Sequence, residues 1–356
     1  MKILVSFKPN KNHDNFEGTR MRKCIKGSLE LNGINYTNTK VDFFDVAHLI
    51  SPIEEDEIKE IKENKAPVVV SALYTEDDPD ACFLEYDREK KLSLLSSKGL
   101  KFLQKVDLIL VPCESAKELL INNGVTTPIN VVSAGVNLSR FDFTKETEKS
   151  LFYRYYGENP NKKLVIAVGE YNPKMEGITS FVNAAKKCPN AMFYYIGRLT
   201  LKTRVNMKFR TLKHSLPKNV KFVDVPPDDI YRSALLNASI FMIPGYKKAG
   251  VTSIVEAMAA KTQIIARRSA IFDGLLEDGV TAHMGEFSET LASLTRDYLE
   301  GKIKPTILQA YNEVTSHTLE VLGGELIKEY QFAINKMNRS DLKWLIKTES
   351  AKILKA

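Results

Sequence analysis

Apolar segments of strand length alternate with longer amphipathic segments along this chain. In segments such as "APVVVSALY" (66–74) and "VDLILVPC" (106–113), nearly every position is apolar. Such continuous runs are typical of strands buried on both faces of a parallel sheet, because crossover helices cover both sides. The pattern predicts an α/β fold. The expected strands cover residues 2–7, 45–50, 66–74, 106–113, 129–135, 163–170, 191–197, 220–225, 238–244 and 262–267.

The strand and helix pattern starts afresh after a polar segment, 143–163, that holds Gly157 and Pro160. A chain of 356 residues has room for two domains of ordinary size. We therefore expect two doubly wound, Rossmann-like domains, 1–150 and 151–335, and a final helix, 336–356, that crosses back to the first domain. The expected helices before it cover 18–32, 88–105, 113–124, 176–187, 203–215, 228–237 and 250–261.

The clearest helix boundaries in the sequence belong to the segment "CESAKELLINNG" (113–124). Ser115 is the expected N-cap, with Glu118 three residues later, and Gly124 is expected to end the helix.

Several protein classes are disfavoured by composition and motifs. Hydrophobic residues make up 44% of the chain and charged residues 27%, as in globular proteins, and no run of eighteen apolar residues occurs. The opening "MKILVSFKPN" predicts a first strand rather than a signal peptide. The four cysteines form no C-x-x-C pair, so we expect a reducing, cytoplasmic setting without zinc or disulfides. The motif "DPD" (78–80) is read as a solvated turn, the five histidines show no ligand spacing, and no metal is expected. Glycine-rich dinucleotide and Walker loops are absent.

The net charge of +7 is concentrated in the second half of the chain. A basic surface can contact phosphates, an anionic membrane or nucleic acid, or can simply be solvated. The segment 88–105 combines six large apolar residues with six cations, which suits a helix lying on an anionic membrane or a helix packed on the sheet. The tail 340–356 has a similar character, with Ser340 as its expected N-cap. Nucleic-acid binding lacks any module signature and is not expected.

Ligands of open α/β sheets bind beyond the carboxyl ends of the strands. Two such domains facing each other would share one cleft, which suits a reaction between two substrates.

Three segments resemble family-4 glycosyltransferases of the GT-B fold. "VDLILVPCESAKELLINNGVTTPINVVSAGVNLSRF" (106–141) is similar to the end of their N-terminal domain, and "AVGEYNPKMEGITSFVNAAKKCPNAMFYYIGR" (167–198) to the opening of their C-terminal domain. "VEAMAAKTQIIARRSAIFDGLLEDGV" (255–280) resembles their nucleotide-sugar block. Within the family, the chain looks most like Gram-positive enzymes that add a hexose to glycosyl-diacylglycerol.

The resemblance implies roles for donor-binding residues. Glu256 would accept hydrogen bonds from the ribose hydroxyls of the nucleotide, although a glutamate in a first helical turn can also be a surface residue. The helix N-terminus at Val251, Thr252 and Ser253 would face the diphosphate. Lys174 would stabilise the diphosphate as the catalytic cation, helped by Arg198 or Arg20, or would be an exposed loop lysine.

The sequence departs from the family pattern at several positions. The first glutamate of the family's Glu-x7-Glu motif is replaced by Lys248, which would contact a phosphate or lie in solvent. Glu170 stands where the family has a phosphate-binding arginine. On the acceptor side, no histidine follows the third expected strand, and the first loop is reduced to "EGTRMR", with Gly18 and Arg20 as candidate contacts. Arg20 could equally be a charge on the helix surface.

The resemblance implies a retaining glycosyltransferase that moves a hexose from a nucleotide sugar, with UDP expected as the nucleotide, to a glycolipid or other glycan. We expect no cofactor, and a location in the cytoplasm or peripherally at the inner face of the membrane. The alternative suggested by Glu170, Lys248 and the missing histidine is a non-catalytic protein of the same fold that binds a glycan or supports a partner transferase.

Overall fold

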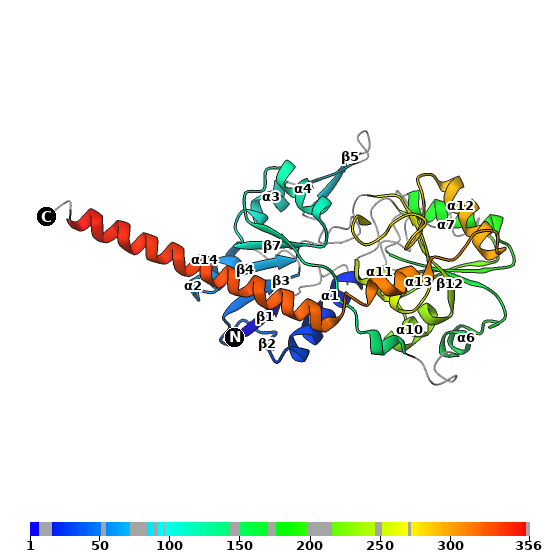
Figure 1. Ribbon diagram of the computed structural model, residues 1–356, viewed down its shortest axis with the longest axis horizontal. Helices are drawn as coiled ribbons and strands as arrows, with labels where there is room; N and C mark the ends of the chain where they lie inside the picture. The colour runs from blue at the N-terminus through cyan, green and yellow to red at the C-terminus, as the bar shows by residue number, and fades with distance from the viewer. Residues whose placement is uncertain are drawn as a thin grey trace.

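The computed structural model describes residues 1–6, 16–50, 55–71, 84–87, 92–95, 97–142, 150–169, 176–197, 216–245, 251–269 and 272–353. It contains two six-stranded parallel sheets, each flanked by helices, which lie next to one another along the long axis of the molecule (Figure 1). The predicted α/β fold with two doubly wound units is confirmed, and each of the ten predicted strand segments contains a strand.

Three of the six strands of the first sheet are buried at every position, as the continuous apolar runs predicted. Its strands, in spatial order, are β2 (Asn35–Thr37), β1 (Lys2–Ser6), β3 (Val46–Leu49), β4 (Val68–Ser71), β7 (Leu108–Val111) and β8 (Ile129–Val131). All five pairings are parallel, so the carboxyl ends of these strands share one edge of the sheet.

Helices cover both faces of the first sheet. One face packs on α2 (Glu55–Glu63), α3 (Ser97–Leu103) and α4 (Glu114–Asn122), through residues such as Ile61 and Leu120. The other face packs on α1 (Phe16–Leu31) and on the long C-terminal helix α14 (Leu319–Ile353), through residues such as Leu29, Leu326 and Tyr330. The last helix therefore contributes to the core of the first domain.

The second sheet repeats this plan. Its strands, in spatial order, are β11 (Val220–Val223), β10 (Met192–Ile196), β9 (Leu164–Val168), β12 (Ala238–Ile243), β13 (Gln263–Arg267) and β14 (His283–Gly285). One face packs on α7 (Glu176–Lys187) and α12 (Ser288–Leu299), and the other on α6 (Leu151–Tyr156), α10 (Asp228–Asn237), α11 (Val251–Ala259) and α13 (Ile307–Val314).

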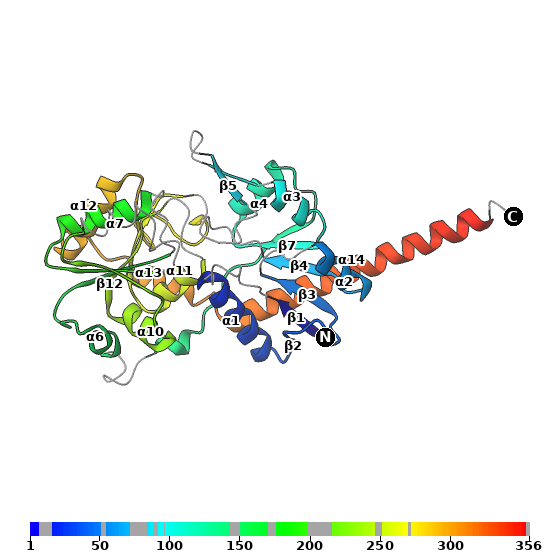
Figure 2. The same cartoon turned by 180° about the vertical axis from the view of Figure 1, so that it is seen from behind.

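The two connections between the domains run side by side. The amide of Val136, after β8, donates to the His317 carbonyl, before α14, at 2.8 Å. A Cβ added at Gly135 would lie 2.8 Å from the Leu322 side chain, so the backbone approach here requires glycine. Beyond this crossing, α14 passes along the first domain and projects past it (Figure 2). The predicted domain boundaries stay predictions, but the crossing helix begins at Leu319.

Three local predictions were wrong. Ser340 is not an N-cap, because it lies inside α14. The segment 88–105 is not one helix, since β6 (Leu92–Leu95) pairs with β5 (Leu84–Asp87) as an antiparallel hairpin, and only α3 is helical. In α3, Phe102 and Leu103 are buried in the core, which removes them from any membrane-facing surface. Ser115 is not the N-cap of α4, because the helix begins at Glu114 and Cys113 precedes it. The helix predicted over 203–215 lies outside the described residues.

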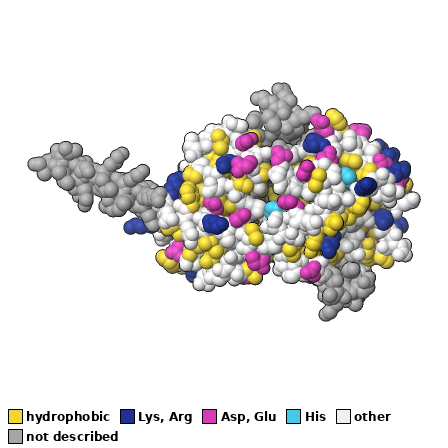
Figure 3. Space-filling model, viewed as in Figure 1, with side chains coloured by type: hydrophobic (Ala, Val, Ile, Leu, Met, Phe, Trp, Pro, Cys, Tyr) yellow, Lys and Arg dark blue, Asp and Glu magenta, His cyan; other side chains and the backbone are white. Residues whose placement is uncertain are grey.

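In the part of the chain that the structure describes, no helix is both long enough and apolar enough to cross a bilayer. On the face seen in Figure 3, basic and acidic side chains are interspersed over both domains.

Candidate active site between the domains

A cleft of 310 Å³ lies between the two domains. The first domain contributes residues that follow the carboxyl ends of β7 and β8, and the second contributes the start of α11 and the segment 273–275. Both domains therefore present residues to one cavity. The lining residues are Pro112, Cys113, Glu114, Ser115, Val131, Ser133, Ala134, Val251, Asp273, Gly274, Leu275 and His317.

A direct contact joins the domains across this cleft. The Ser115 hydroxyl at the start of α4 donates to the Asp273 carboxylate at 2.8 Å. Ser115, predicted as a helix cap, thus contacts the other domain instead. Burial raises the pKa of the neighbouring Cys113 thiol, so this cysteine stays neutral near pH 7.

The N-terminus of α11 opens onto the cleft. Val251, its first residue, lines the cavity, whereas the Thr252 and Ser253 side chains are buried beneath it. The first amides of a helix have no intrahelical partner, and the helix dipole places partial positive charge there. This end of α11 can therefore receive an anion from the cleft.

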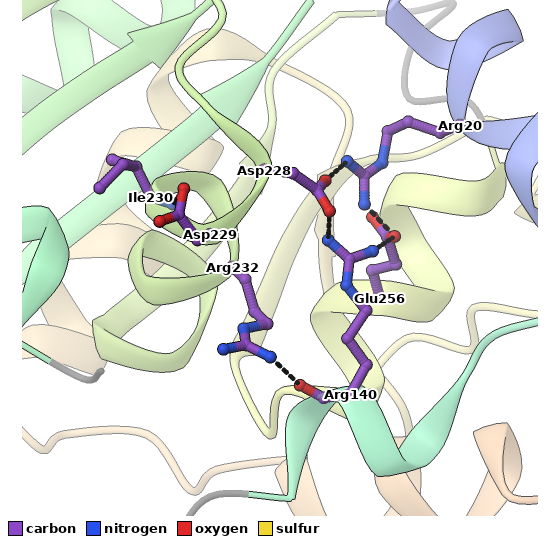
Figure 4. A network of polar contacts seen from close by, with 7 residues as sticks. All are labelled: Arg20, Arg140, Asp228, Asp229, Ile230, Arg232 and Glu256. Atoms are coloured by element: carbon purple, nitrogen blue, oxygen red, sulfur yellow. Dashed lines mark hydrogen bonds and ion pairs between the residues drawn. The ribbon is translucent and has the colours of Figure 1, made fainter. Parts of the chain in front are cut away.

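Glu256 lies in the second turn of α11 and is only 3% exposed. Its carboxylate is paired with Arg20 from α1 of the first domain, and the Arg140 guanidinium lies 3.4 Å from the same oxygen. Arg140 belongs to η2 (Leu138–Phe141), a short helix in the connection between the domains. One buried carboxylate thus joins three separate parts of the chain (Figure 4).

Asp228 completes this network from the first turn of α10. It contacts Arg140 at 2.5 Å and Arg20 at 3.5 Å (Figure 4). Burial alone would raise the pKa of Asp228, but the Arg140 and Arg20 guanidinium groups outweigh burial and hold it below its ordinary value. Asp228 is 46% exposed, so the network reaches solvent on this side.

An aromatic ring supports the same arginine. The Arg20 guanidinium lies 4.3 Å from the centre of the Tyr231 ring on α10. Arg20 is only 6% exposed, so its charge is stabilised by two carboxylates and one π face rather than by water. We call Arg20, Arg140, Asp228 and Glu256 the interdomain ion network.

Of the predicted site residues, the structure brings Arg20 and Glu256 into contact and places Val251 on the cleft. Gly18 is buried in the first turn of α1. Lys174, Lys248, Arg198 and Glu170 lie outside the described residues, so their roles stay predictions.

Neither Arg140 nor Asp228 was predicted from the sequence as a site residue. Asp228 and Asp229 stand in the first turn of α10, where acidic residues are expected merely to complement the helix dipole. No motif in the sequence marks Arg140 as a site residue. Within the described residues, no group of three or more His, Cys, Asp or Glu side chains could hold a metal ion, and the prediction of no metal stays a prediction.

Two Rossmann-like domains that face a common cleft define the class of protein, and comparison with solved structures agrees. The Anabaena protein Alr3699/HepE, solved in complex with UDP and glucose, superposes with a TM-score of 0.70 at 14% identity, covering 93% of this chain and 99% of that one. At this identity the likeness shows the fold, which is GT-B.

The family described as glycosyl transferases group 1 matches residues 152–314. The chain therefore carries a glycosyltransferase domain of this family, as the sequence resemblance implied. The processive diacylglycerol alpha-glucosyltransferase of Acholeplasma laidlawii is 24% identical over 87% of this chain and 91% of its own length. The alpha-galactosylglucosyldiacylglycerol synthase of Streptococcus pneumoniae is 24% identical over 44% of this chain and 41% of its own.

Proposed function

We propose that this protein transfers a hexose from UDP to a hydroxyl group of a glycolipid, with retention of anomeric configuration. The two relatives named above are glycolipid glycosyltransferases, and the first aligns with most of both chains. The fold neighbour was solved with UDP and glucose, which supports UDP as the nucleotide.

The observation that carries the proposal is the placement of α11. Its N-terminus opens onto the interdomain cleft at Val251, and the Glu256 carboxylate lies behind it, in the second turn. A nucleoside diphosphate needs an anion site and an acceptor for the ribose diol, and these two features supply both. In the proposed complex the diphosphate meets the start of α11 and the ribose hydroxyls donate to Glu256.

Charge on the departing diphosphate is the main electrostatic demand of this transfer. We assign its stabilisation to Lys174, with Arg198 and Lys248 as further cations and the α11 dipole as a fixed partial charge. No metal ion or cofactor is required in this scheme, because positive charge comes from the chain itself.

On the acceptor side, the start of α1 at Gly18 borders the cleft in our proposal. Arg20, two residues later, contacts Glu256 and therefore belongs to the donor half of the site. A glycolipid acceptor would bring the protein to the inner face of the cell membrane as a peripheral protein. Equal and negligible co-sedimentation with anionic and neutral vesicles would contradict this location.

Titration with UDP, UDP-glucose and UDP-galactose, followed by transfer assays with glycosyl-diacylglycerol, tests the function. Glu256→Gln should weaken UDP binding by about 1–3 kcal/mol, the scale of a charged hydrogen bond. Glu158→Gln is the control, because Glu158 is also a paired carboxylate of the second domain but contacts Lys221 and Tyr194 instead. Unchanged UDP affinity in Glu256→Gln would remove the ribose role.

A non-catalytic protein of the same fold is the second candidate. The observation in its favour is that Arg20 already holds the Glu256 carboxylate, which is nearly inaccessible in this structure. UDP binding without transfer from any common UDP-hexose would favour this candidate over the enzyme.

A further inference from the structure

Arg267 is the last residue of β13, and its side chain is only 1% exposed. Within the described residues, the guanidinium donates hydrogen bonds to three different parts of the second domain. Nε donates to the Pro244 carbonyl at 2.8 Å, and the two terminal nitrogens donate to the Glu286 carbonyl and the Ser180 hydroxyl, each at 2.6 Å.

These acceptors all lie at the carboxyl edge of the second sheet. Pro244 directly follows β12, Glu286 directly follows β14, and Ser180 lies in the second turn of α7, the helix that follows β9. One planar side chain therefore holds the connections that leave three different strands. A guanidinium suits this task because its donors diverge in a rigid fork.

Two of these connections also touch each other. A Cβ added at Gly177, near the start of α7, would lie 3.0 Å from the Gly245 Cα and 3.1 Å from its amide nitrogen. Backbone therefore packs on backbone beside the Arg267 hydrogen bonds. Gly245 stands six residues before Val251, the first residue of α11, so the Arg267 contact to Pro244 fixes the point at which the chain leaves β12 toward that helix.

We propose that Arg267 is a positioning residue for the donor diphosphate. It sets the start of α7 and the segment after β12 at a fixed separation, and so aims the N-terminus of α11 at the cleft. The inference rests on the proposed function. Misplacing a binding group by about 1 Å can cost on the order of a hundredfold in rate, so such a brace has a direct catalytic consequence.

A role in packing alone does not account for this choice of residue. Moving a guanidinium out of water is costly, and apolar side chains of similar volume often replace buried ionic groups without loss of stability. What an apolar residue cannot do is bind two carbonyl groups and a hydroxyl in defined directions. The position is therefore occupied by a residue that gives directional contacts to loops at the site edge.

The test compares two matched serines of the second domain. Ser180→Ala removes one Arg267 contact, and Ser233→Ala removes a hydroxyl that is equally buried, at 1% exposure, but accepts from the Phe152 amide at 3.0 Å. Arg267→Met removes all three contacts. Arg267→Lys keeps the positive charge but lacks the forked donors of a guanidinium, so it shows whether charge alone is sufficient. Melting temperature, UDP affinity, the KM for UDP-hexose and kcat are measured for each variant.

We expect UDP affinity to fall about threefold to tenfold in Ser180→Ala and more than tenfold in Arg267→Met, with little rescue by Arg267→Lys. Ser233→Ala should lower the melting temperature without changing UDP affinity or KM. Equal UDP affinity in wild type, Ser180→Ala and Arg267→Met would overturn the proposal. So would an affinity loss in Ser233→Ala as large as that in Ser180→Ala.

A readout without ligand separates this inference from the proposed function. Hydrogen exchange at the Val182 and Asn183 amides, which lie beyond the first turn of α7, should become faster in Ser180→Ala and Arg267→Met, but not in Ser233→Ala. Faster exchange in a protein that binds no UDP would mean that the brace exists and the proposed function is wrong. Unchanged exchange would mean that Arg267 does not hold these connections, whatever the protein binds.

Discussion

At the scale of single residues, His48 is a fully buried titratable side chain. It lies on β3 with no exposed surface, its Nε2 is 2.7 Å from the Ser71 hydroxyl, and its Nδ1 is 2.7 Å from the Tyr330 hydroxyl. Burial lowers the pKa of His48 to about 3 and raises that of Tyr330. The histidine is therefore neutral in the folded protein, and it joins two strands of the first sheet to α14.

This pKa predicts a pH dependence of stability. An unfolded histidine binds a proton near pH 6.5, whereas folded His48 does so only near pH 3. Its contribution is therefore complete above about pH 6.5, and falls by about 1.4 kcal/mol for each pH unit below it. Urea denaturation at a series of pH values measures the slope.

In His48→Gln the slope should become shallower, because no group is left to bind that proton. Tyr330→Phe is the control, since it removes a hydrogen bond but leaves the histidine buried, and it should lower stability at every pH while keeping the slope. An identical slope in wild type and His48→Gln would show that other groups cause the acid sensitivity.

At the scale of elements, the contact between α1 and α14 decides how the C-terminal helix is attached. Asn32 directly follows α1. Its side-chain Nδ2 donates to the Ser28 carbonyl at 2.9 Å and to the Glu320 carbonyl, in the first turn of α14, at 3.2 Å. Gly323 faces this bridge, and a Cβ there would lie 2.5 Å from the Ser28 carbonyl oxygen and also overlap the Asn32 amide. The helices can approach this closely because position 323 has no side chain.

Two adjacent glycines test this contact. Gly323→Ala should destabilise the protein by about 1–3 kcal/mol, because the added methyl group must displace backbone or break the Asn32 bridge. Gly324→Ala is the matched control, since its Cβ would meet no atom within 4 Å and alanine favours the helix by up to about 1 kcal/mol. Denaturation midpoints of the two variants are compared. Equal effects would mean that helix propensity alone matters here.

At the scale of the whole molecule, the interdomain ion network opposes the proposed ligand. The ribose diol would have to donate to a carboxylate that Arg20 and Arg140 already hold. The structure thus shows a state in which two arginines occupy the Glu256 carboxylate. The larger the fraction of molecules in that state, the lower the apparent affinity for a nucleotide.

Removing one arginine of the network should therefore raise the affinity for UDP. Arg20→Ala should bind UDP about tenfold more tightly, equivalent to about 1.4 kcal/mol, because the ribose no longer competes with Arg20 while Arg140 remains to hold Glu256. Arg22→Ala is the control on the same helix, since its side chain contacts Asn38 instead. Calorimetric titration measures both. Weaker binding in Arg20→Ala would mean that Arg20 touches the nucleotide, as a phosphate contact would.

Much of the molecule follows from local sequence. Continuous apolar runs predicted all ten strand segments, because a strand covered on both faces must be apolar at nearly every position. The short edge strands β2 and β14 have no such run, and both were missed. The hairpin at 84–95 was missed because the leucines at 92 and 95 fit helical spacing as well as a strand, and only pairing with β5 decides between them.

The candidate site divides in the same way. From the family resemblance, Glu256 and the start of α11 could be named as candidates, and their binding roles stay predictions. Arg140, Asp228 and Arg267 could not, because their partners are fixed by the meeting of distant elements. The ion pair between Arg20 and Glu256 spans 236 positions, and the Ser115 contact to Asp273 spans 158.

The sequence by itself determined most strands of the two sheets and most of their helices, because burial imposes a period on each element. Only the tertiary structure decided which charges meet across the cleft. Strong ionic contacts require groups within a few ångströms, and that distance is set by how the two domains are placed, not by spacing along the chain. For this reason Arg20, which the sequence suggested as a contact for the acceptor substrate, instead pairs with Glu256, the carboxylate proposed to hold the nucleotide.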